Sequence, residues 1–113
     1  MNAPYIVENP EDQIGIEEGT TVMFSIIVVG MKLTFNWMFQ NGSQLPTDLK
    51  YSGQNTSMFT IFFVSYDDSA LYLCEVYNPA GSVVSQPARL SVCELLHQYF
   101  FYPSKFIYYY IFS

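Results

Sequence analysis

Hydrophobic and polar residues alternate along most of the first 92 positions. Residues 20–29, TTVMFSIIVV, place four apolar side chains on one face at a period of two, namely Val22, Phe24, Ile26 and Val28. Residues 34–40, TFNWMFQ, do the same with Phe35, Trp37 and Phe39. A period of two is that of a half-buried β-strand, so both segments are predicted as strands with one face in the core.

Further strands follow from the same pattern and from the turn residues between them. Residues 57–64 present Phe59 and Ile61 as an inward pair, and residues 71–77 alternate up to the turn sequence NPAG. Beyond that turn, the second arm of a hairpin is expected to continue through Val92. The two arms and their turn predict a β-hairpin.

The N-terminal strand is predicted in two parts, residues 5–8 and 13–16. Pro10 lies between them and cannot donate a hydrogen bond to a β-ladder. No window of about eleven residues before Glu94 keeps its apolar residues at helical spacing. Short strands separated by turn residues predict an all-β sandwich or barrel, and 113 residues suffice for one domain with a single core.

The pattern changes after Glu94. Residues 95–113 crowd Tyr, Phe and Ile together without alternation or helical spacing. We therefore assign the domain to residues 4–94 and interpret residues 95–113 as an irregular, apolar aromatic tail outside the fold. Because these residue types have A/T-rich codons, our hypothesis for its origin is translated non-coding sequence. Its uninterrupted apolar stretch, residues 106–112, is far shorter than the ~20 residues that cross a bilayer, so we expect no transmembrane helix and no membrane contact.

The charge balance limits the kinds of partner. Ten Asp and Glu residues against four Lys and Arg residues give a formal net charge of −6. Most of the surface would therefore repel a phosphate backbone, which argues against nucleic acid as a partner. The start of the chain, MNAPYIVENP, lacks the basic and then apolar segments of a signal peptide. We expect either a cytosolic protein or a piece of a longer secreted one.

Cys74 and Cys93 are the two cysteines of the chain. If residues 78–81 form the turn of the hairpin, Cys74 faces Ser85. Cys93 then lies about eight residues, roughly 27 Å, further along the partner strand at ~3.4 Å per residue. Bridged Cα atoms lie about 4.4–6.8 Å apart, so this hairpin excludes a bond between the two cysteines.

Several motifs, in the correct order, resemble those of immunoglobulin-like domains of the intermediate (I-set) type. The segment DSALYLC at residues 68–74 resembles their D-x-[GA]-x-Y-x-C signature, and Trp37 stands where their strand-C tryptophan does. The segment GTTV resembles the turn into their strand B, and NPAGSVVSQPARLSV resembles their last hairpin. The resemblance covers about residues 4–94 and implies an immunoglobulin-like, two-sheet antiparallel β-sandwich.

The resemblance also implies roles for residues at the corner before residues 71–77. Tyr72 would return its hydroxyl to a backbone carbonyl a few residues upstream and so fix the corner. Asp68 lies at the same corner, where in the family a carboxylate often meets a basic residue near the start of strand D. Lys50 is the candidate for that partner, and an exposed pair of this kind contributes only ~0–1 kcal/mol.

The strand-B position that would carry the partner cysteine of this family is Ile26. Cys74 is therefore interpreted as a reduced, buried thiol that packs as a small hydrophobe against Ile26 and Trp37, with Tyr72 in the same core. A missing disulfide of this loop length removes ~3–4 kcal/mol of stabilisation, which aromatic packing must replace. A catalytic thiol would need a nearby histidine, and the single histidine is His97, in the tail.

No cofactor or metal site is expected. One histidine and two separated cysteines lack zinc spacing, and the acidic residues near the N-terminus lack a calcium-loop pattern. We interpret these residues as a solvated acidic edge: Glu8, Glu11, Asp12, Glu17 and Glu18. Cys93 follows Val92, the last inward residue, so we expect it to face outward or lie at the domain end. It would be either an incidental surface thiol or a bond to a neighbouring domain.

The sequence predicts a protein that binds and does not catalyse. Nothing in it resembles a phosphate loop, a paired carboxylate site or a Ser/His/Asp arrangement, so we expect neither an enzyme nor a small-molecule substrate. Asn41 and Asn55 begin N-glycosylation sequons, which modestly favours an extracellular location. The prediction is a binding or spacer module of a larger, extracellular adhesion or receptor protein, with other protein domains as partners. The alternative is an intracellular (cytoplasmic) structural module of the giant muscle-protein kind, whose domains often lack the disulfide.

Overall fold

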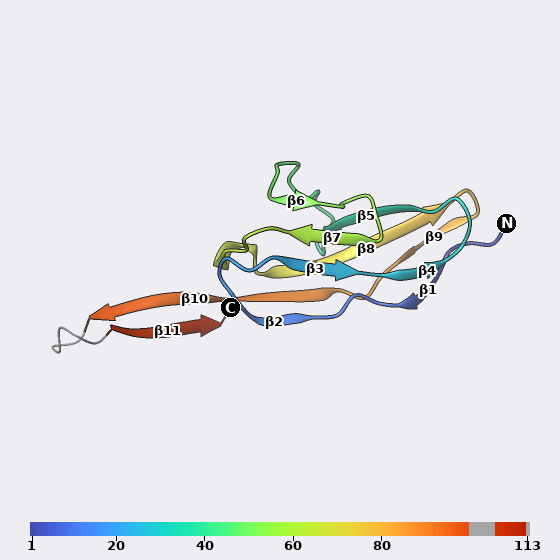
Figure 1. Cartoon of the computed structure of the whole chain (residues 1–113). Coiled ribbons are helices and arrows are strands. Elements are labelled where there is room, and N and C mark those ends of the chain that lie inside the picture. Colours follow the sequence, from blue (N-terminus) through green and yellow to red (C-terminus); the bar gives the residue numbers. More distant parts are fainter. Residues whose placement is uncertain (100–105, 113) are drawn as a thin grey trace.

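The computed structural model of the chain describes residues 1–99 and 106–112, the stretches 95–99 and 106–112 by their backbone. Within this part the chain is all β except for one turn of 3-10 helix, η1 (Tyr66–Asp68). The strands form two layers that face each other across one core (Figure 1). The all-β sandwich that the sequence predicts is confirmed.

The first layer is built from five short strands: β1 (Tyr5–Glu8), β3 (Val22–Ser25), β4 (Ile27–Val29), β6 (Tyr51–Ser52) and β7 (Met58–Ile61). β1 pairs antiparallel with β4, and β7 pairs antiparallel with both β3 and β6. β3 and β4 are two halves of the single strand expected at residues 20–29, interrupted at Ile26. The N–H of Ile26 still donates a 3.0 Å hydrogen bond to the carbonyl of Ser57, so this layer continues across the interruption.

The second layer contains the longer strands: β2 (Gln13–Glu17), β5 (Thr34–Phe39), β8 (Ala70–Asn78), β9 (Gly81–Val84) and β10 (Ala88–Tyr99). β8 pairs antiparallel with β5, β9 and β10, and β10 also pairs with β2 in parallel. In the hairpin of β8 and β9, Tyr77 lies opposite Ser82, which is the register that the turn sequence predicts. The second arm is not continuous, because Pro87 has no N–H and the chain bends between β9 and β10.

The predicted split of the N-terminal strand is confirmed. β1 belongs to the first layer and β2 to the second, and the chain crosses between them through residues 9–12. This crossing is fixed to the bend before β10, because the Oδ1 of Asn9 accepts a 2.8 Å hydrogen bond from the N–H of Gln86. As a result, the chain leaves the first layer at the end of β1, next to β3.

The core lies between the layers and consists of the residues that alternation places inward. Its largest fully buried side chains include four aromatic residues: Phe24, Trp37, Phe59 and Tyr72. Their ring centroids lie 5.6 to 6.5 Å apart where the rings contact. Such tilted and stacked pairs add to the stabilisation that burial itself provides.

The backbone after Glu94 differs from the irregular tail that the sequence predicts. β10 continues to Tyr99, and β11 (Phe106–Phe112) pairs with it antiparallel, with Cys93 opposite Phe112. Figure 1 shows this ribbon leaving the sandwich at the end opposite the N-terminus. Tyr, Phe and Ile have high β-propensity, and a ribbon that covers no core needs no alternation, so the pattern could not indicate it. The connection at residues 100–105 lies outside the described part.

The N-terminal end of the sandwich is fixed by Asn78, the last residue of β8. Its Nδ2 donates hydrogen bonds to the carbonyls of Asn2 (2.9 Å) and Met31 (3.1 Å). Its Oδ1 accepts from the N–H groups of Ala80 (2.9 Å) and Gly81 (3.2 Å). One buried amide thus joins the β8–β9 turn, the N-terminal segment and the loop after β4.

Candidate functional site

Trp37 lies at the centre of the core on β5. Its ring centroid is 5.8 Å from that of Phe59 and 6.4 Å from that of Phe24. It lies directly opposite Cys74 in the pairing of β5 with β8. Ile26 belongs to the same cluster of buried residues, so the four core residues named from the sequence, Ile26, Trp37, Tyr72 and Cys74, all lie between the two layers.

Cys74 is a free thiol with 0% of its surface exposed. Burial raises the pKa of this thiol to about 12, because the thiolate would lose its hydration. The thiol donates to the carbonyl of Glu75 at 3.7 Å, and the N–H of Cys74 donates to the Oγ of Ser85 at 2.9 Å. A buried thiol that is protonated at neutral pH packs as a small hydrophobe and is a poor nucleophile.

Tyr72 turns its ring into the core and its hydroxyl toward the corner before β8. The hydroxyl donates a hydrogen bond to the backbone carbonyl of Asp68. Burial, and then the charge of Asp68, raise the pKa of this phenol far above its usual range. The hydroxyl therefore stays protonated and keeps the η1 turn against the start of β8.

The side chain of Asp68 forms an ion pair and hydrogen bonds with polar groups at the same corner. Its Oδ2 lies 2.7 Å from the Nζ of Lys50, with 31% of the lysine and 6% of the aspartate side chain exposed. The N–H of Ser65 donates to Oδ2 at 2.7 Å, and the hydroxyl of Tyr51 donates to Oδ1 at 3.1 Å. From the sequence, Lys50 was predicted at this corner, but Ser65 and Tyr51 were missed. Ser65 and Asp68 form a local capping box at η1, which the spacing Ser-x-x-Asp could have indicated. The contact of Tyr51 depends on how β6 approaches η1 and has no such local pattern. Burial, and then the charge of Asp68, raise the pKa of Tyr51 to about 12.

Cys93 is buried, with 2% of its surface exposed, so of the two alternatives expected for it the outward-facing one is wrong. It does lie at the end of the domain, one residue after the family match ends. Ser91, Val92 and Cys93 are all buried, which means that both faces of β10 are covered there. The strand also has neighbours on both edges, because Cys93 lies beside Glu17 of β2 and Phe112 of β11. Burial raises the pKa of this thiol, and the negative charge of Glu17 raises it further.

The acidic residues near the N-terminus are exposed, as a solvated edge would be, but two of them also hold backbone groups. The Oδ1 of Asp12 accepts a 2.8 Å hydrogen bond from the N–H of Arg89. The Oε1 of Glu18 accepts a 3.2 Å hydrogen bond from the N–H of Tyr66. These carboxylates connect the N-terminal strand to β10 and to η1.

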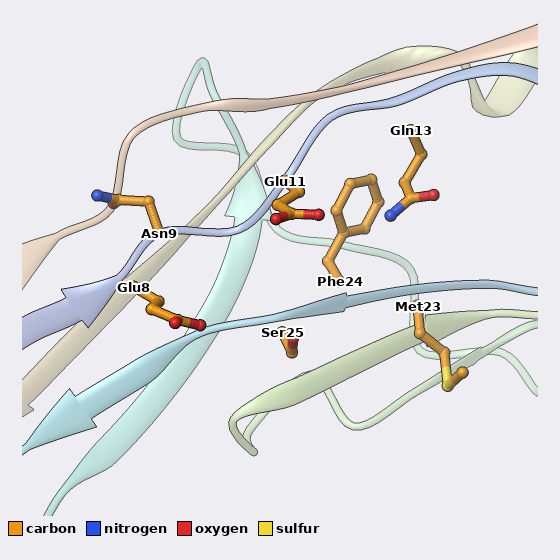
Figure 2. Close-up of a pocket in the computed structure, with 7 residues that line it drawn as sticks. All are labelled: Glu8, Asn9, Glu11, Gln13, Met23, Phe24 and Ser25. Carbon is orange, nitrogen blue, oxygen red and sulfur yellow. The ribbon is translucent and has the colours of Figure 1, made fainter.

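A cleft of about 500 Å³ opens next to β3, at the point where the chain leaves the first layer after β1. Figure 2 shows the residues that line it: Glu8, Asn9, Glu11, Gln13, Met23, Phe24 and Ser25. β3 pairs with β7 on one edge and faces this cleft with the other. Two carboxylates, Glu8 and Glu11, lie here without a basic residue in the lining. The cleft could not be read from the sequence, because it results from the crossing of residues 9–12 between layers.

Both sequon asparagines are exposed and lie in loops. The Oδ1 of Asn41 accepts a 2.9 Å hydrogen bond from the N–H of Ser43. The Nδ2 of Asn55, the atom to which a glycan would be joined, donates to the carbonyl of Phe35 at 3.3 Å. The acceptor nitrogen of Asn55 would have to give up this bond to carry a glycan.

Comparison with protein families identifies the fold group of this sandwich. The family model of the immunoglobulin I-set domain matches residues 4–92. The chain belongs to the immunoglobulin I-set family. This I-set domain is 31% identical over 94 residues to cartilage intermediate layer protein 2 from Homo sapiens. That match covers 81% of this chain but only 8% of the length of the human protein.

Solved immunoglobulin domains have the same architecture as this I-set domain. Titin M4 superposes with a TM-score of 0.71 at 25% identity, over 80% of this chain and 96% of the titin chain. The N-terminal Ig1-2 module of the Drosophila receptor protein tyrosine phosphatase DLAR gives a TM-score of 0.71 at 23% identity, over 79% of this chain and 45% of that one. At 23% identity, the similarity to the DLAR module shows a shared fold and nothing more.

Within the residues that the structure describes, no group of three or more His, Cys, Asp or Glu side chains is placed to hold a metal ion. No helix in the same part of the chain is long and apolar enough to span a membrane. The side chain of His97, which a catalytic cysteine would need, lies outside the described residues. What the comparisons establish is an immunoglobulin-type module, and nothing among them points to an enzyme.

Proposed function

We propose that this I-set domain is a non-catalytic binding or spacer module within a longer extracellular adhesion or receptor protein. The observation that carries the proposal is the placement of the two ends of the sandwich. Asn78 holds the N-terminal segment at one end, and β10 leaves at the other (Figure 1). Domains joined in this way can follow one another in line, with both sheet faces free for other protein domains.

Two further observations support the proposal, one its extracellular location and the other its being part of a longer protein. Both sequons lie in exposed loops, as a glycan on a secreted protein requires. The relative from Homo sapiens is also far longer than this chain, which fits a single module of a large protein.

The second candidate is an intracellular structural module, favoured by the state of the cysteines. Cys74 and Cys93 are both free and buried, and reduced thiols are typical of the cytosol. The likeness to titin M4 agrees with this candidate in fold.

A surface-labelling experiment separates the two candidates. The full-length natural protein would be treated on intact cells with a membrane-impermeant biotin reagent and then with an N-glycosidase. We expect biotinylation and a glycosidase-sensitive decrease in mass that Asn41→Gln reduces. Asn2→Gln, outside any sequon, is the matched control and should leave the decrease unchanged. A protein that is labelled only after permeabilisation and is insensitive to the glycosidase would instead support the intracellular candidate.

A further inference from the structure

The outward face of the first layer carries a group of large apolar side chains. Each is between 48% and 70% exposed. We call this group the outer face, and its members are Tyr5, Val7, Met23, Ile27, Val29 and Met58. They come from β1, β3, β4 and β7, which are neighbours in this layer.

The strand register places these side chains on one side of the layer, with Ser25 and Thr60 between Met23 and Met58. Tyr5 lies opposite Val29 in the β1–β4 pair, and Met58 lies opposite Ser25 in the β3–β7 pair. Residues 22–29 are therefore apolar on both faces, apart from Ser25. Strands with apolar residues on both faces are typical of sheets that are covered on both sides, and contiguous exposed apolar patches mark interaction sites.

One border of the outer face is acidic. Met23 belongs both to the outer face and to the lining of the cleft that contains Glu8 and Glu11 (Figure 2). Lys50 is already paired with Asp68, and the formal net charge of the chain is −6. Two copies of this chain would therefore repel each other, whereas a basic partner would be attracted to this border.

We propose that the outer face binds an apolar β-strand of another protein whose ends carry Lys or Arg, with one of these cations entering the cleft between Glu8 and Glu11. This deepens the proposed binding function by naming the surface and the chemistry of the partner. Apolar side chains of the partner strand cover Val7, Ile27 and Met23, and the cation is paired where β1 leaves β3. The opposite layer takes no part.

The test uses the full chain and two synthetic peptides, KKVTVTVKK and EEVTVTVEE, followed by NMR chemical shifts of the backbone amides. The lysine peptide should shift the amides of β1, β3 and β4, and the glutamate peptide should bind at least about tenfold more weakly. Raising the salt concentration from about 50 to about 300 mM should weaken binding of the lysine peptide severalfold. Equal binding of the two peptides, no binding of either, or shifts confined to the opposite layer would refute the proposal.

Paired variants assign the effect to the outer face and to the cleft. The double variant Val7→Thr with Ile27→Thr should weaken binding of the lysine peptide at least about fivefold. The double variant Glu8→Gln with Glu11→Gln should weaken it by at least as much. Asp67→Asn with Glu75→Gln removes two charges that belong to neither the outer face nor the cleft lining and should change binding by less than about twofold. An equal loss in this control pair would overturn the role of the cleft.

Sedimentation of the chain alone tests whether a second copy of this chain covers the outer face. A monomer is expected, and a dimer that Val7→Thr with Ile27→Thr abolishes would show that a second copy covers the outer face. The surface-labelling result does not depend on these measurements, so the proposed location and this binding surface fail separately.

Discussion

The indole Nε1 of Trp37 donates a 2.8 Å hydrogen bond to the carbonyl oxygen of Thr56. The backbone N–H of Trp37 also donates to the carbonyl of Gln54, at 2.9 Å. One residue of β5 thus holds the turn before β7 with both its side chain and its backbone. The central aromatic of the core and the loop at the outer edge of β5 form a single structural unit.

Replacing Trp37 should strongly destabilise the domain. Trp37→Ala removes the largest buried side chain and should lower the free energy of unfolding by ~3–5 kcal/mol, a large part of the ~5–15 kcal/mol available to a domain of this size. Trp37→Phe keeps most of the ring volume but leaves the carbonyl of Thr56 unpaired, at a cost of ~1–3 kcal/mol. Chemical denaturation measures both. A Trp37→Ala variant that melts within a few degrees of the parent would exclude Trp37 from the core.

Gly53 should tolerate no side chain. Its φ is +78°, and a Cβ built there would lie 2.0 Å from the carbonyl oxygen of Met58. Gly53→Ala should therefore cost more than ~2 kcal/mol, because backbone strain and a backbone clash add together. Gly42→Ala is the matched control, since Gly42 has a φ of +89° with nothing within 4 Å of the added Cβ. Equal costs for the two variants in thermal denaturation would contradict the clash at Gly53.

The free energy of unfolding should depend more on Asp68 than on its partner Lys50. Lys50→Met removes a partly exposed, solvent-screened partner and should cost only ~0–1 kcal/mol. Asp68→Ala leaves the N–H of Ser65 and the hydroxyl of Tyr51 without their acceptor and should cost ~2–3 kcal/mol. A double-mutant cycle on Lys50 and Asp68 measures the pair alone. A coupling energy as large as the whole cost of Asp68→Ala would show that the ion pair dominates.

The free energy of unfolding should fall as the pH rises above about 9. The pKa of Cys74 is raised from 9.0 to about 12, so the unfolded chain loses this proton before the folded one does. A raised folded pKa contributes stability that is present below the unfolded pKa and is lost between the two values. Tyr51, raised from 10.0 to about 12, acts in the same direction from a higher pH.

Urea denaturation at several pH values between about 8 and 11 measures this effect. In Cys74→Ala the decline between about pH 9 and pH 10 should be shallower, because only Cys93, whose pKa is also raised, then contributes in this range before the tyrosines do. An unchanged slope in Cys74→Ala would mean that this thiol is accessible to water in the folded domain.

Deleting residues 95–113 should leave the stability of the sandwich within about 1 kcal/mol of the full chain. The described core residues all precede Glu94, and the removed segment is β-prone, weakly charged and an aggregation hazard. The shorter chain keeps three basic and ten acidic residues, a net charge of 3 − 10 = −7. Its solubility should improve. Deleting residues 91–113 instead removes the buried Val92 and should unfold the domain. A loss of more than about 2 kcal/mol in the first deletion would place β11 inside the domain.

Local patterns predicted most of the sandwich, because burial of one face leaves alternation in the sequence. Pro10 likewise indicated the split between β1 and β2 through its missing N–H. The outer face was not predicted, because residues 20–29 were interpreted as a strand with one buried face, Val22, Phe24, Ile26 and Val28, and the apolar residues on its other side were not considered. Cys93 and the cleft beside β3 depend on which strands lie next to one another, and such non-local pairing leaves no short pattern.

The contacts of Asn78 determine where flexibility at the N-terminal end can begin. Because its amide holds the carbonyl of Asn2, any hinge to a preceding domain must lie before Asn2 and not at the start of β1. Asn78→Ala would release the first residues and move the hinge toward Tyr5, which would widen the range of angles between neighbouring domains. The freedom of the first residues therefore depends on this one side-chain amide.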